Sequence, residues 1–392
     1  MPEIILNNDV NSARILVIGV GGAGNNTVDR MIRQEVTGVD YLCVNTDRQQ
    51  LDRCLTSNVM QIGAALTKGL GAGANPDIGR SAAIESKEEI AKVLDGVDMV
   101  FITCGMGGGT GTGAAPIIAE MSKSAGILTV GAVTRPFKYE GTVRKRNADG
   151  GIEELKKFVD TLIVVPNDKL LEISDRNTSL PKALEKADTV LQQGIQGITD
   201  LITKPGLINL DFADVRTVMK DKGLAHFGMG EASGANKCLD AVKMAVNSPL
   251  LETKIDHASH VIVNFSGDVG LLEVSEANDY ITGIVGEDSA MFFGSIVENE
   301  GSDHVTVTLI ATGLDGPQSK FPYMNKSLGV SMDKPFARPA SPTASAPAPT
   351  AAPSPAPAPG SQTAAPKGIT IPDPVKPTRT LNNIEVPTFL KK

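Results

Sequence analysis

The stretch Gly107-Gly-Gly-Thr-Gly-Thr-Gly113 carries five glycines in seven residues. It follows a segment typical of an apolar strand, residues 98–104, and precedes one typical of a helix, residues 114–120. Glycine lets the backbone turn tightly and approach a ligand, and the following helix directs free N–H groups and its positive dipole end at that ligand. The arrangement suits a phosphate. A flexible linker is disfavoured because a strand and a helix flank the run.

Composition and charge indicate a soluble globular protein. The chain has 392 residues, enough for two or three domains, with 41% hydrophobic and 21% charged residues. A formal net charge of -8 argues against a nucleic-acid partner. No apolar run is long enough to cross a bilayer, and the N-terminus lacks the features of a secretion signal. We therefore expect a cytoplasmic protein with no nucleic-acid partner and no direct membrane insertion.

Cysteine and histidine spacing predicts no metal site. None of the cysteines has CxxC spacing, so free buried thiols in a reducing compartment are expected. His257 and His260 have HxxH spacing without a third ligand nearby. The cysteines are Cys43, Cys54, Cys104 and Cys238.

Hydrophobic patterning predicts alternating strands and helices up to about residue 165. Strands are expected at residues 14–19, 41–44, 99–103, 127–133 and 161–165, and helices at 26–34, 86–94 and 142–158. Such alternation indicates a parallel sheet covered on both faces.

A long helix and a second αβ unit follow. Apolar positions spaced by three or four between Leu184 and Ile202 predict a helix over residues 180–203, which Pro205 and Gly206 end. The second unit, residues 224–315, has strands expected at 260–265, 291–297 and 304–311 and helices at 236–246 and 271–281. The expected class is therefore α/β: a parallel-sheet nucleotide-binding domain, a long central helix and a smaller αβ domain.

The composition changes abruptly after about residue 333. Residues 340–366 carry no charge and consist mostly of Ala, Pro, Ser and Thr, so they cannot bury enough apolar surface to fold. Apolar side chains return at residues 383–392, which end in two lysines. The end is either a frayed tail or a docking peptide on a disordered tether. We favour docking because a tether needs something at its end.

Two further glycine-rich stretches must be weighed with the first. Gly19-Val-Gly-Gly-Ala-Gly24 matches the GxGxxG fingerprint of dinucleotide-binding folds, with Asp47 as the candidate ribose ligand. Residues 69–76 are also glycine-rich. One pyrophosphate does not need three glycine loops, whereas a nucleoside triphosphate could use them all. Because GxxxxGK[ST] is absent, backbone N–H groups, helix ends and Mg²⁺ would meet the phosphate charge.

Taken in order, these motifs resemble those of the FtsZ family, the bacterial tubulin-like cell-division GTPases. The run at residues 107–113 resembles the tubulin signature, and its companions narrow the match. The resemblance covers residues 11–315 approximately and resumes at the C-terminal peptide. The companions are GVGGAGNN at 19–26, NTD at 45–47, GAGANP at 71–76, RPFKYEG at 135–141 with Arg144, VPND at 165–168 and GLINLDFADVR at 206–216.

The resemblance implies a tubulin/FtsZ-like fold and a site for GTP or GDP, with Mg²⁺ and K⁺ as candidate cations. Two of the loops would hold the phosphates, a third would sense the γ-phosphate, and further residues would contact ribose and recognise guanine. The phosphate residues are Gly21, Gly22, Ala23, Gly24, Asn25, Asn26, Gly107, Gly108, Gly109, Thr110, Gly111 and Thr112; the sensor is Ala72, Gly73, Ala74 and Asn75; Glu140 and Arg144 contact ribose and neighbouring groups; Asn26, Asn167 and Asp188 recognise guanine.

Of two residues in the implied guanine site, Asp188 fits its role chemically and Leu184 departs from the family pattern. A carboxylate at Asp188 suits guanine, whose N1–H and N2–H₂ donors it can accept as a pair, although a helical Asp is usually solvated. Leu184 stands where many relatives place an aromatic residue that stacks on the base. Such stacking contributes roughly 1–3 kcal/mol, of which apolar contact from Leu184 would replace only part, while selection of GTP should survive.

The candidate catalytic residues are Asn209, Asp211 and Asp214. Asp211 and Asp214 are three residues apart and share a helical face, where the sequence alone favours capping of a helix. The resemblance instead implies that this loop enters the nucleotide pocket of the next subunit. There the carboxylates would orient the attacking water and Asn209 would help to place it. Such a head-to-tail contact predicts a filament and a GTPase activated by self-assembly.

The resemblance also implies a domain scheme and partners. Residues 384–392 would bind membrane-adaptor and regulatory division proteins at mid-cell, where the polymer would form the cytokinetic (Z) ring and recruit the division machinery. Two alternatives stay open: an NAD-dependent oxidoreductase built on residues 19–24, and a regulatory GTP-binding module that never polymerises. The expected domains are a GTP-binding domain (1–178), the central helix (179–204), a C-terminal GTPase-activating domain (205–318), a disordered Ala/Pro-rich linker (319–380) and a docking peptide (381–392).

Overall fold

The structure is a computed structural model, and it describes residues 13–172, 180–204, 206–208, 210–248, 253–296 and 303–314. All of them lie in one compact unit, Met1–Pro322. The side chains of residues 172, 180, 181, 183 and 184 lie outside this description, as do the expected linker and docking peptide. Within the described residues, no helix combines the length and the apolar character that a membrane span requires.

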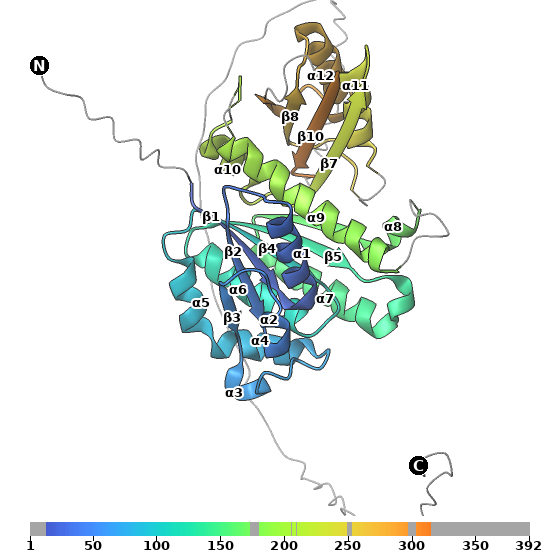
Figure 1. The fold of residues 1–392 in the computed structure, drawn as a ribbon. Coiled ribbons are helices and arrows are strands. Elements are labelled where there is room, and N and C mark those ends of the chain that lie inside the picture. The colour runs from blue at the N-terminus through green and yellow to red at the C-terminus, as the bar shows by residue number, and fades with distance from the viewer. Residues whose placement is uncertain are drawn as a thin grey trace, which may run out of the picture. The chain divides into compact units, whose positions relative to one another are not determined.

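Strands and helices alternate along the chain (Figure 1). The strands are β1 (Ile15–Val20), β2 (Asp40–Asn45), β3 (Val59–Gln61), β4 (Met99–Gly105), β5 (Leu128–Arg135), β6 (Thr161–Pro166), β7 (Gly223–Ser233), β8 (His260–Gly267), β9 (Ala290–Ile296) and β10 (His304–Thr312). The helices are α1 (Gly21–Arg33), α2 (Arg48–Leu51), α3 (Ala64–Thr67), α4 (Pro76–Glu85), α5 (Lys87–Leu94), α6 (Thr110–Ser124), the 3-10 helix η1 (Lys138–Glu140), α7 (Thr142–Phe158), α8 (Asn167–Glu172), α9 (Leu180–Thr203), α10 (Phe212–Met219), α11 (Lys237–Val246) and α12 (Leu271–Val285).

The strands form one ten-stranded sheet in the order β3-β2-β1-β4-β5-β6-β7-β10-β8-β9. Every pair from β3 to β7 is parallel, as predicted for the first half of the chain. The second half is mixed, because β10 pairs antiparallel with both β7 and β8 while β8 and β9 are parallel. The two halves join where Thr161 and Leu162 of β6 pair with Gly223 and Leu224 of β7.

Alternating strand residues separate two cores on the two faces of the parallel sheet. Val17 of β1 packs in the cluster under α1, α9 and α10, whereas its neighbour Ile18 packs in the cluster under α4, α5, α6 and α7. Helix α9 has the predicted bounds and also packs on the second half of the sheet, since Ile195 shares a cluster with Phe227 and Ile262. Figure 1 shows α9 between these two halves.

Several elements differ from the sequence-based expectation, among them the unpredicted strand β3 and helix α4. Helices α1 and α6 begin at Gly21 and Thr110, earlier than predicted, so parts of the glycine stretches form first helical turns. Strand β7 was not predicted, because Gly228 and Gly230 weaken the strand pattern. Both glycines are needed there, since a Cβ at either position would run into backbone oxygens of α11.

Candidate functional site

The strand order reverses between β1 and β4, and this reversal positions the glycine-rich segments. From β1 the sheet continues through β2 on one side and through β4 on the other. In such sheets, ligands bind in the crevice outside the carboxyl ends of the strands at the point of reversal. Helix α1 begins directly after β1, and α6 begins shortly after β4. The N-terminal ends of both helices therefore face the crevice and favour an anionic ligand.

Side-chain hydrogen bonds tie the end of β2 to both helices. Asn45 Nδ2 donates to Asn25 Oδ1 at 2.7 Å, and Asn25 Nδ2 donates to the Gly19 carbonyl at 2.9 Å. The hydroxyls of Thr46 and Thr110 lie 2.7 Å apart. These contacts fix the start of α1 against the start of α6, so the backbone N–H groups of the crevice are held in place before a ligand arrives.

The third glycine segment packs directly on the second. A Cβ added at Gly109 would lie 2.7 Å from Ala72 Cβ and 3.0 Å from Asn75 N, so residues 72–75 touch the run at 107–113. Ala74 adopts φ 59°, a left-handed conformation that costs a non-glycine residue about 1–2 kcal/mol. Backbone strain of this kind clusters at ligand-binding sites. The three predicted phosphate segments thus meet at one place.

A cavity of about 330 Å³ lies beside these segments. Six of the predicted residues line it: Ala23, Asn26, Glu140, Arg144, Asn167 and Asp188. The sequence reasoning missed the other six: Gly105, Met106, Thr134, Pro136, Tyr139 and Ala187. Pro136 and Tyr139 lie inside the quoted RPFKYEG motif, and Thr134 is near the carboxyl end of β5, so motif membership and strand ends were signals that could have identified them.

Asp188 enters this cavity from α9, and its environment is unusual for a helical carboxylate. Burial raises the pKa of Asp188 to about 6, and Arg30, whose Nη2 lies 4.0 Å from Asp188 Oδ2, opposes part of that rise. Thr27 Oγ1 donates to Asp188 Oδ1 at 3.4 Å. Nearby, the buried Asn167 Oδ1 has no hydrogen-bond partner among the described residues. The cavity therefore presents acceptors that suit the N–H donors of guanine.

Glu140 and Arg144 form the rim of the same cavity. Arg144 Nε lies 3.0 Å from Glu140 Oε2, and the Phe137 backbone N–H donates to Glu140 Oε1 at 2.9 Å. The buried Phe137 ring stacks on Tyr139 with 4.9 Å between centroids, which supports Tyr139 as an aromatic wall. The predicted base-stacking position, Leu184, lies in α9, but its side chain is outside the described residues.

The candidate catalytic carboxylates do not line this cavity of their own chain. Asp211 is the N-cap of α10 and Asp214 is in its first turn, which confirms the capping role that the sequence alone favours. Further along α10, Arg216 Nη2 donates to the Gly126 carbonyl at 3.0 Å, just before β5 begins. Helix α10 is therefore near the amino edge of the parallel sheet, whereas the cavity is at the carboxyl edge. Asn209 lies outside the described residues.

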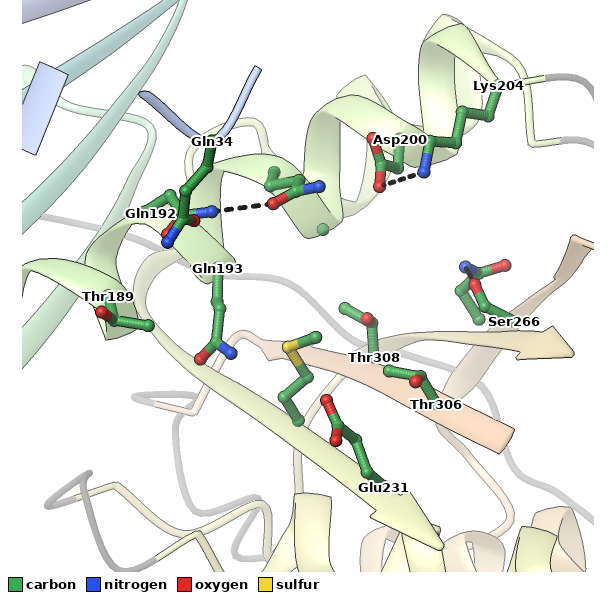
Figure 2. Close-up of a pocket in the computed structure, with 14 residues that line it drawn as sticks. Gln34, Thr189, Gln192, Gln193, Asp200, Lys204, Glu231, Ser266, Thr306 and Thr308 are labelled. Atoms are coloured by element: carbon green, nitrogen blue, oxygen red, sulfur yellow. Dashed lines mark hydrogen bonds and ion pairs between the residues drawn. The ribbon is translucent and has the colours of Figure 1, made fainter. Parts of the chain in front are cut away.

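A second cavity, of about 320 Å³, lies between α9 and strands β7, β8 and β10 (Figure 2). Its lining is polar: Gln192 Nε2 donates to Gln196 Oε1 at 2.9 Å, and Lys204 Nζ lies 3.0 Å from Asp200 Oδ2. No glycine-rich segment or helix start is among its lining residues, so it lacks the backbone donors of a phosphate site.

Comparisons with known proteins agree with this geometry. Residues 14–175 match the family model described as Tubulin/FtsZ family, GTPase domain, and residues 223–315 match FtsZ family, C-terminal domain. An empty FtsZ dimer from M. jannaschii is 46% identical, covering 77% of this chain and 88% of that chain with a TM-score of 0.72. A GTPγS-bound CetZ2 protofilament from Haloferax volcanii shares the fold at 18% identity, covering 76% and 92% with a TM-score of 0.66.

The family matches exclude the alternative that residues 19–24 belong to an NAD-dependent oxidoreductase. Asp47, the residue that it would place on a ribose, instead caps α2 by accepting a hydrogen bond from Gln49 N at 2.9 Å. The glycine segments instead meet at the starts of α1 and α6, where an anionic ligand is favoured, and the cavity beside them presents hydrogen-bond acceptors. Taken with the matching family models and the M. jannaschii relative, this architecture shows that the chain belongs to the FtsZ family and is a tubulin-like GTPase.

Proposed function

We propose that the chain polymerises head to tail and hydrolyses GTP at each contact between subunits, as the cell-division protein that forms the cytokinetic (Z) ring. One observation carries this proposal: Asp211 and Asp214 are remote from the nucleotide cavity of their own chain, on the helix beside the amino edge of the sheet. Stacking one subunit on the next would bring one subunit's acidic pair to another's cavity. A heterologous contact of this kind repeats into a filament.

In this arrangement the neighbour would complete the hydrolytic site. Asp211 and Asp214 would orient the attacking water, and Asn209 would help to place it near the γ-phosphate. Supplying a missing group in trans accelerates GTP hydrolysis by about 10³–10⁵ in other GTPases. Residues 72–75, which include the strained Ala74, would sense the γ-phosphate. Loss of that phosphate would weaken the same contact and couple turnover to disassembly.

Mg²⁺ is proposed to be held chiefly by phosphate oxygens and water. The two carboxylates that line the cavity already face arginines, Glu140 with Arg144 and Asp188 with Arg30, while the glycine segments supply N–H and hydroxyl groups. Bound Mg²⁺ would neutralise charge on the phosphates. K⁺ is a further proposed cation to which no residue is assigned.

The remaining expectations concern the domains and the tail. The scheme of five segments with boundaries at residues 178, 204, 318 and 380 is our proposal, with residues 319–380 as a tether. Residues 384–392 would dock membrane-adaptor and regulatory division proteins at the cytoplasmic mid-cell site. The proposal that this chain associates with copies of itself is supported by the relatives that are described as a dimer and as a protofilament.

Mixing two inactive variants tests completion in trans. The double variant Asp211→Asn/Asp214→Asn keeps its GTP cavity, whereas Asp188→Ala keeps its acidic pair. We expect neither to release phosphate alone, the mixture to do so, and the wild-type rate to rise faster than protein concentration. Light scattering after GTP addition follows polymer formation. A mixture that co-assembles without turnover, or full-speed hydrolysis by dilute monomer, would reject the proposal. GTP binding without scattering would favour a non-polymerising regulatory module.

A further inference from the structure

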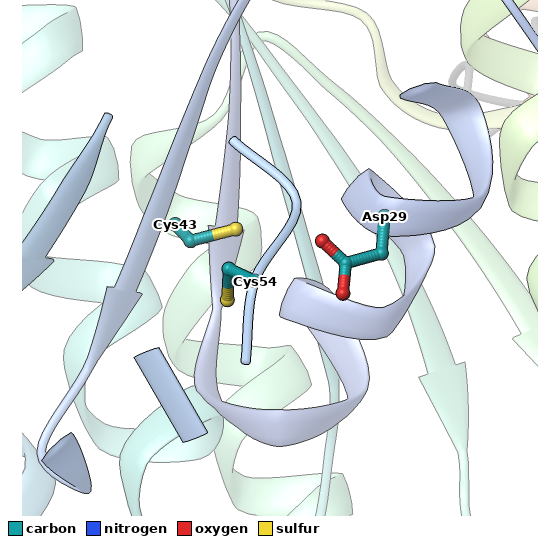
Figure 3. A group of neighbouring side chains, drawn as sticks. All are labelled: Asp29, Cys43 and Cys54. Carbon is teal, nitrogen blue, oxygen red and sulfur yellow. The ribbon is translucent and has the colours of Figure 1, made fainter. Parts of the chain in front are cut away.

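A carboxylate and two thiols from three different elements meet on one side of β2. Asp29 belongs to α1, Cys43 to β2, and Cys54 to the segment after α2. One carboxylate oxygen and the two Sγ atoms all lie within 4.8 Å of one another. Figure 3 shows the three side chains around a common space. The sequence offered no sign of this group, because its members are not spaced as in known cysteine motifs.

The burial of the three groups differs in a way that suits a bound ion. Cys43 is fully buried, whereas Asp29 and Cys54 are partly exposed, so the expectation that every thiol is buried is wrong for Cys54. The group thus has a dry side and a side that solvent reaches. Leu55 N donates to Asp29 Oδ1 at 2.8 Å, which holds the carboxylate beside the Cys54 segment. The second oxygen of a carboxylate can still coordinate a cation.

The separations are close to those of a tetrahedral metal site. Zinc–sulfur bonds of about 2.3 Å at the tetrahedral angle place two sulfurs about 3.8 Å apart. The present limit of 4.8 Å therefore requires the two sulfurs to approach each other by at most about 1 Å. Cys43 is held on both sides, because it pairs with Gly19 of β1 and Val59 of β3. Cys54 lies outside any helix or strand, so its segment can supply the movement.

Without a cation the two thiols stay protonated. Burial is the main reason that the pKa of each thiol is raised, and the charge of Asp29 raises both further. Protonated thiols are poor nucleophiles, which disfavours disulfide exchange at this pair. A thiophilic cation favours the thiolate over the protonated thiol, because each sulfur–metal bond that forms replaces one S–H bond and releases its proton to solvent.

We propose that Asp29, Cys43 and Cys54 bind one thiophilic divalent cation, of which Zn²⁺ is the type, with water as the fourth ligand. Two thiolates select such a cation against Mg²⁺ and Ca²⁺, which prefer oxygen ligands. The site adjoins the phosphate cradle, because the Cys43 thiol interacts with the Asn25 side chain that anchors the start of α1. It is nevertheless separate from the cavity assigned to GTP, none of whose lining residues it shares.

Cobalt titration of the full chain tests the site. Co²⁺ occupies tetrahedral zinc sites and gives a sulfur-to-metal charge-transfer band together with visible bands. The protein is kept reduced by a phosphine, free of nucleotide because triphosphates chelate the probe, and in excess Mg²⁺ to fill oxygen sites. We expect one equivalent of Co²⁺ to bind with the charge-transfer band and to be displaced by one equivalent of Zn²⁺.

Variants assign the bands to this group. Cys54→Ala and Asp29→Asn should each weaken Co²⁺ binding by at least about tenfold. Asn at position 29 retains an oxygen that can accept from Leu55 N, so this variant guards against loss of folding. The matched control, Cys238→Ala, removes a thiol of α11 and should leave the titration unchanged. Zn²⁺ should raise the melting temperature of the wild type and the control but not of Cys54→Ala.

Three results would overturn the proposal. The first is the absence of a sulfur-to-cobalt band in the reduced wild type. The second is a band of unchanged affinity in both Cys54→Ala and Asp29→Asn. The third is a rise in the melting temperature of Cys54→Ala with Zn²⁺ that equals the rise in the wild type, because such a rise would come from another site.

Discussion

Asp211 and Asp214 cap each other's backbone across the first turn of α10. Asp214 N donates to Asp211 Oδ1 at 2.8 Å, and Asp211 N donates to Asp214 Oδ2 at 3.3 Å. This reciprocal capping needs a short acceptor side chain at each position, but it does not require a negative charge. The structural role and the proposed catalytic role can therefore be separated by substitution.

Asp211→Asn should keep the helix and lose turnover. Asparagine caps as well as aspartate does, whereas Asp211→Ala should also cost about 1 kcal/mol of unfolding free energy. Denaturant unfolding and phosphate release under polymerising conditions measure the two effects. Asp240→Asn, which removes a carboxylate from the first turn of α11, is the control. Wild-type turnover in Asp211→Asn would show that capping is the whole role of this residue.

GTP affinity should fall as the pH drops below about 6. Burial raises the pKa of Asp188 to about that value, and only the ionised carboxylate can accept both guanine donors. Each further pH unit then costs up to about tenfold in affinity, or 1.36 kcal/mol. Nucleotide titrations at constant salt between pH 5 and 8 measure this. Asp188→Asn should bind more weakly and without the pH dependence; an equally steep profile in that variant would assign it to another group.

Asp188 should also make the unfolding free energy of the nucleotide-free protein depend on pH. In contrast to GTP affinity, this contribution should fall as the pH rises. Because the pKa of Asp188 is raised in the folded state, the folded chain binds this proton more tightly than the unfolded chain. Its stabilising contribution is present at acidic pH and is lost as the pH rises through about 6. Comparing the pH dependence of unfolding in the wild type and in Asp188→Asn isolates the contribution, which should be missing from the variant.

Two glycines of the phosphate segments should respond differently to alanine. A Cβ at Gly24 would collide with the Thr103 carbonyl oxygen and lie 3.0 Å from Gly19 C, so Gly24→Ala should cost about 1–3 kcal/mol of unfolding free energy. A Cβ at Gly108 meets no atom within 4 Å, so Gly108→Ala should leave stability unchanged. Thermal unfolding of the two variants is the measurement. Equal melting temperatures would contradict the close contact of α1 with β4.

Deletion of residues 384–392 should leave GTP turnover and polymer formation intact. Those residues follow the proposed tether, so their loss should remove only docking to adaptors. Sedimentation after GTP addition and localisation of a fluorescent fusion measure the two properties. Deletion of residues 345–353, an equal length of the tether, is the matched control. Continued recruitment of the truncated chain to the membrane would contradict a docking role.

The sequence by itself determined the kind of fold and the kind of ligand. Glycine runs between apolar strands and helices constrain the backbone locally, so the phosphate segments and the parallel first half could be predicted. Helix α9 has the predicted bounds because its amphipathic spacing is a local property. The resemblance named Asp188 and Asp211, which patterning alone interprets as a solvated residue and a cap.

Only the tertiary structure decided which elements meet. The reversal of strand order at β1 and β4 joins residues 72–75 to the run at 107–113, and packing on α1 buries Asp188 and shifts its pKa. The segment after α2 folds back beside β2 and places Cys54 near Cys43. A local pattern records which face of an element is apolar, but not which distant element covers that face. The element that packs over a charged side chain sets the effective dielectric around that side chain and supplies its partners. Its pKa and its chemical role depend on both.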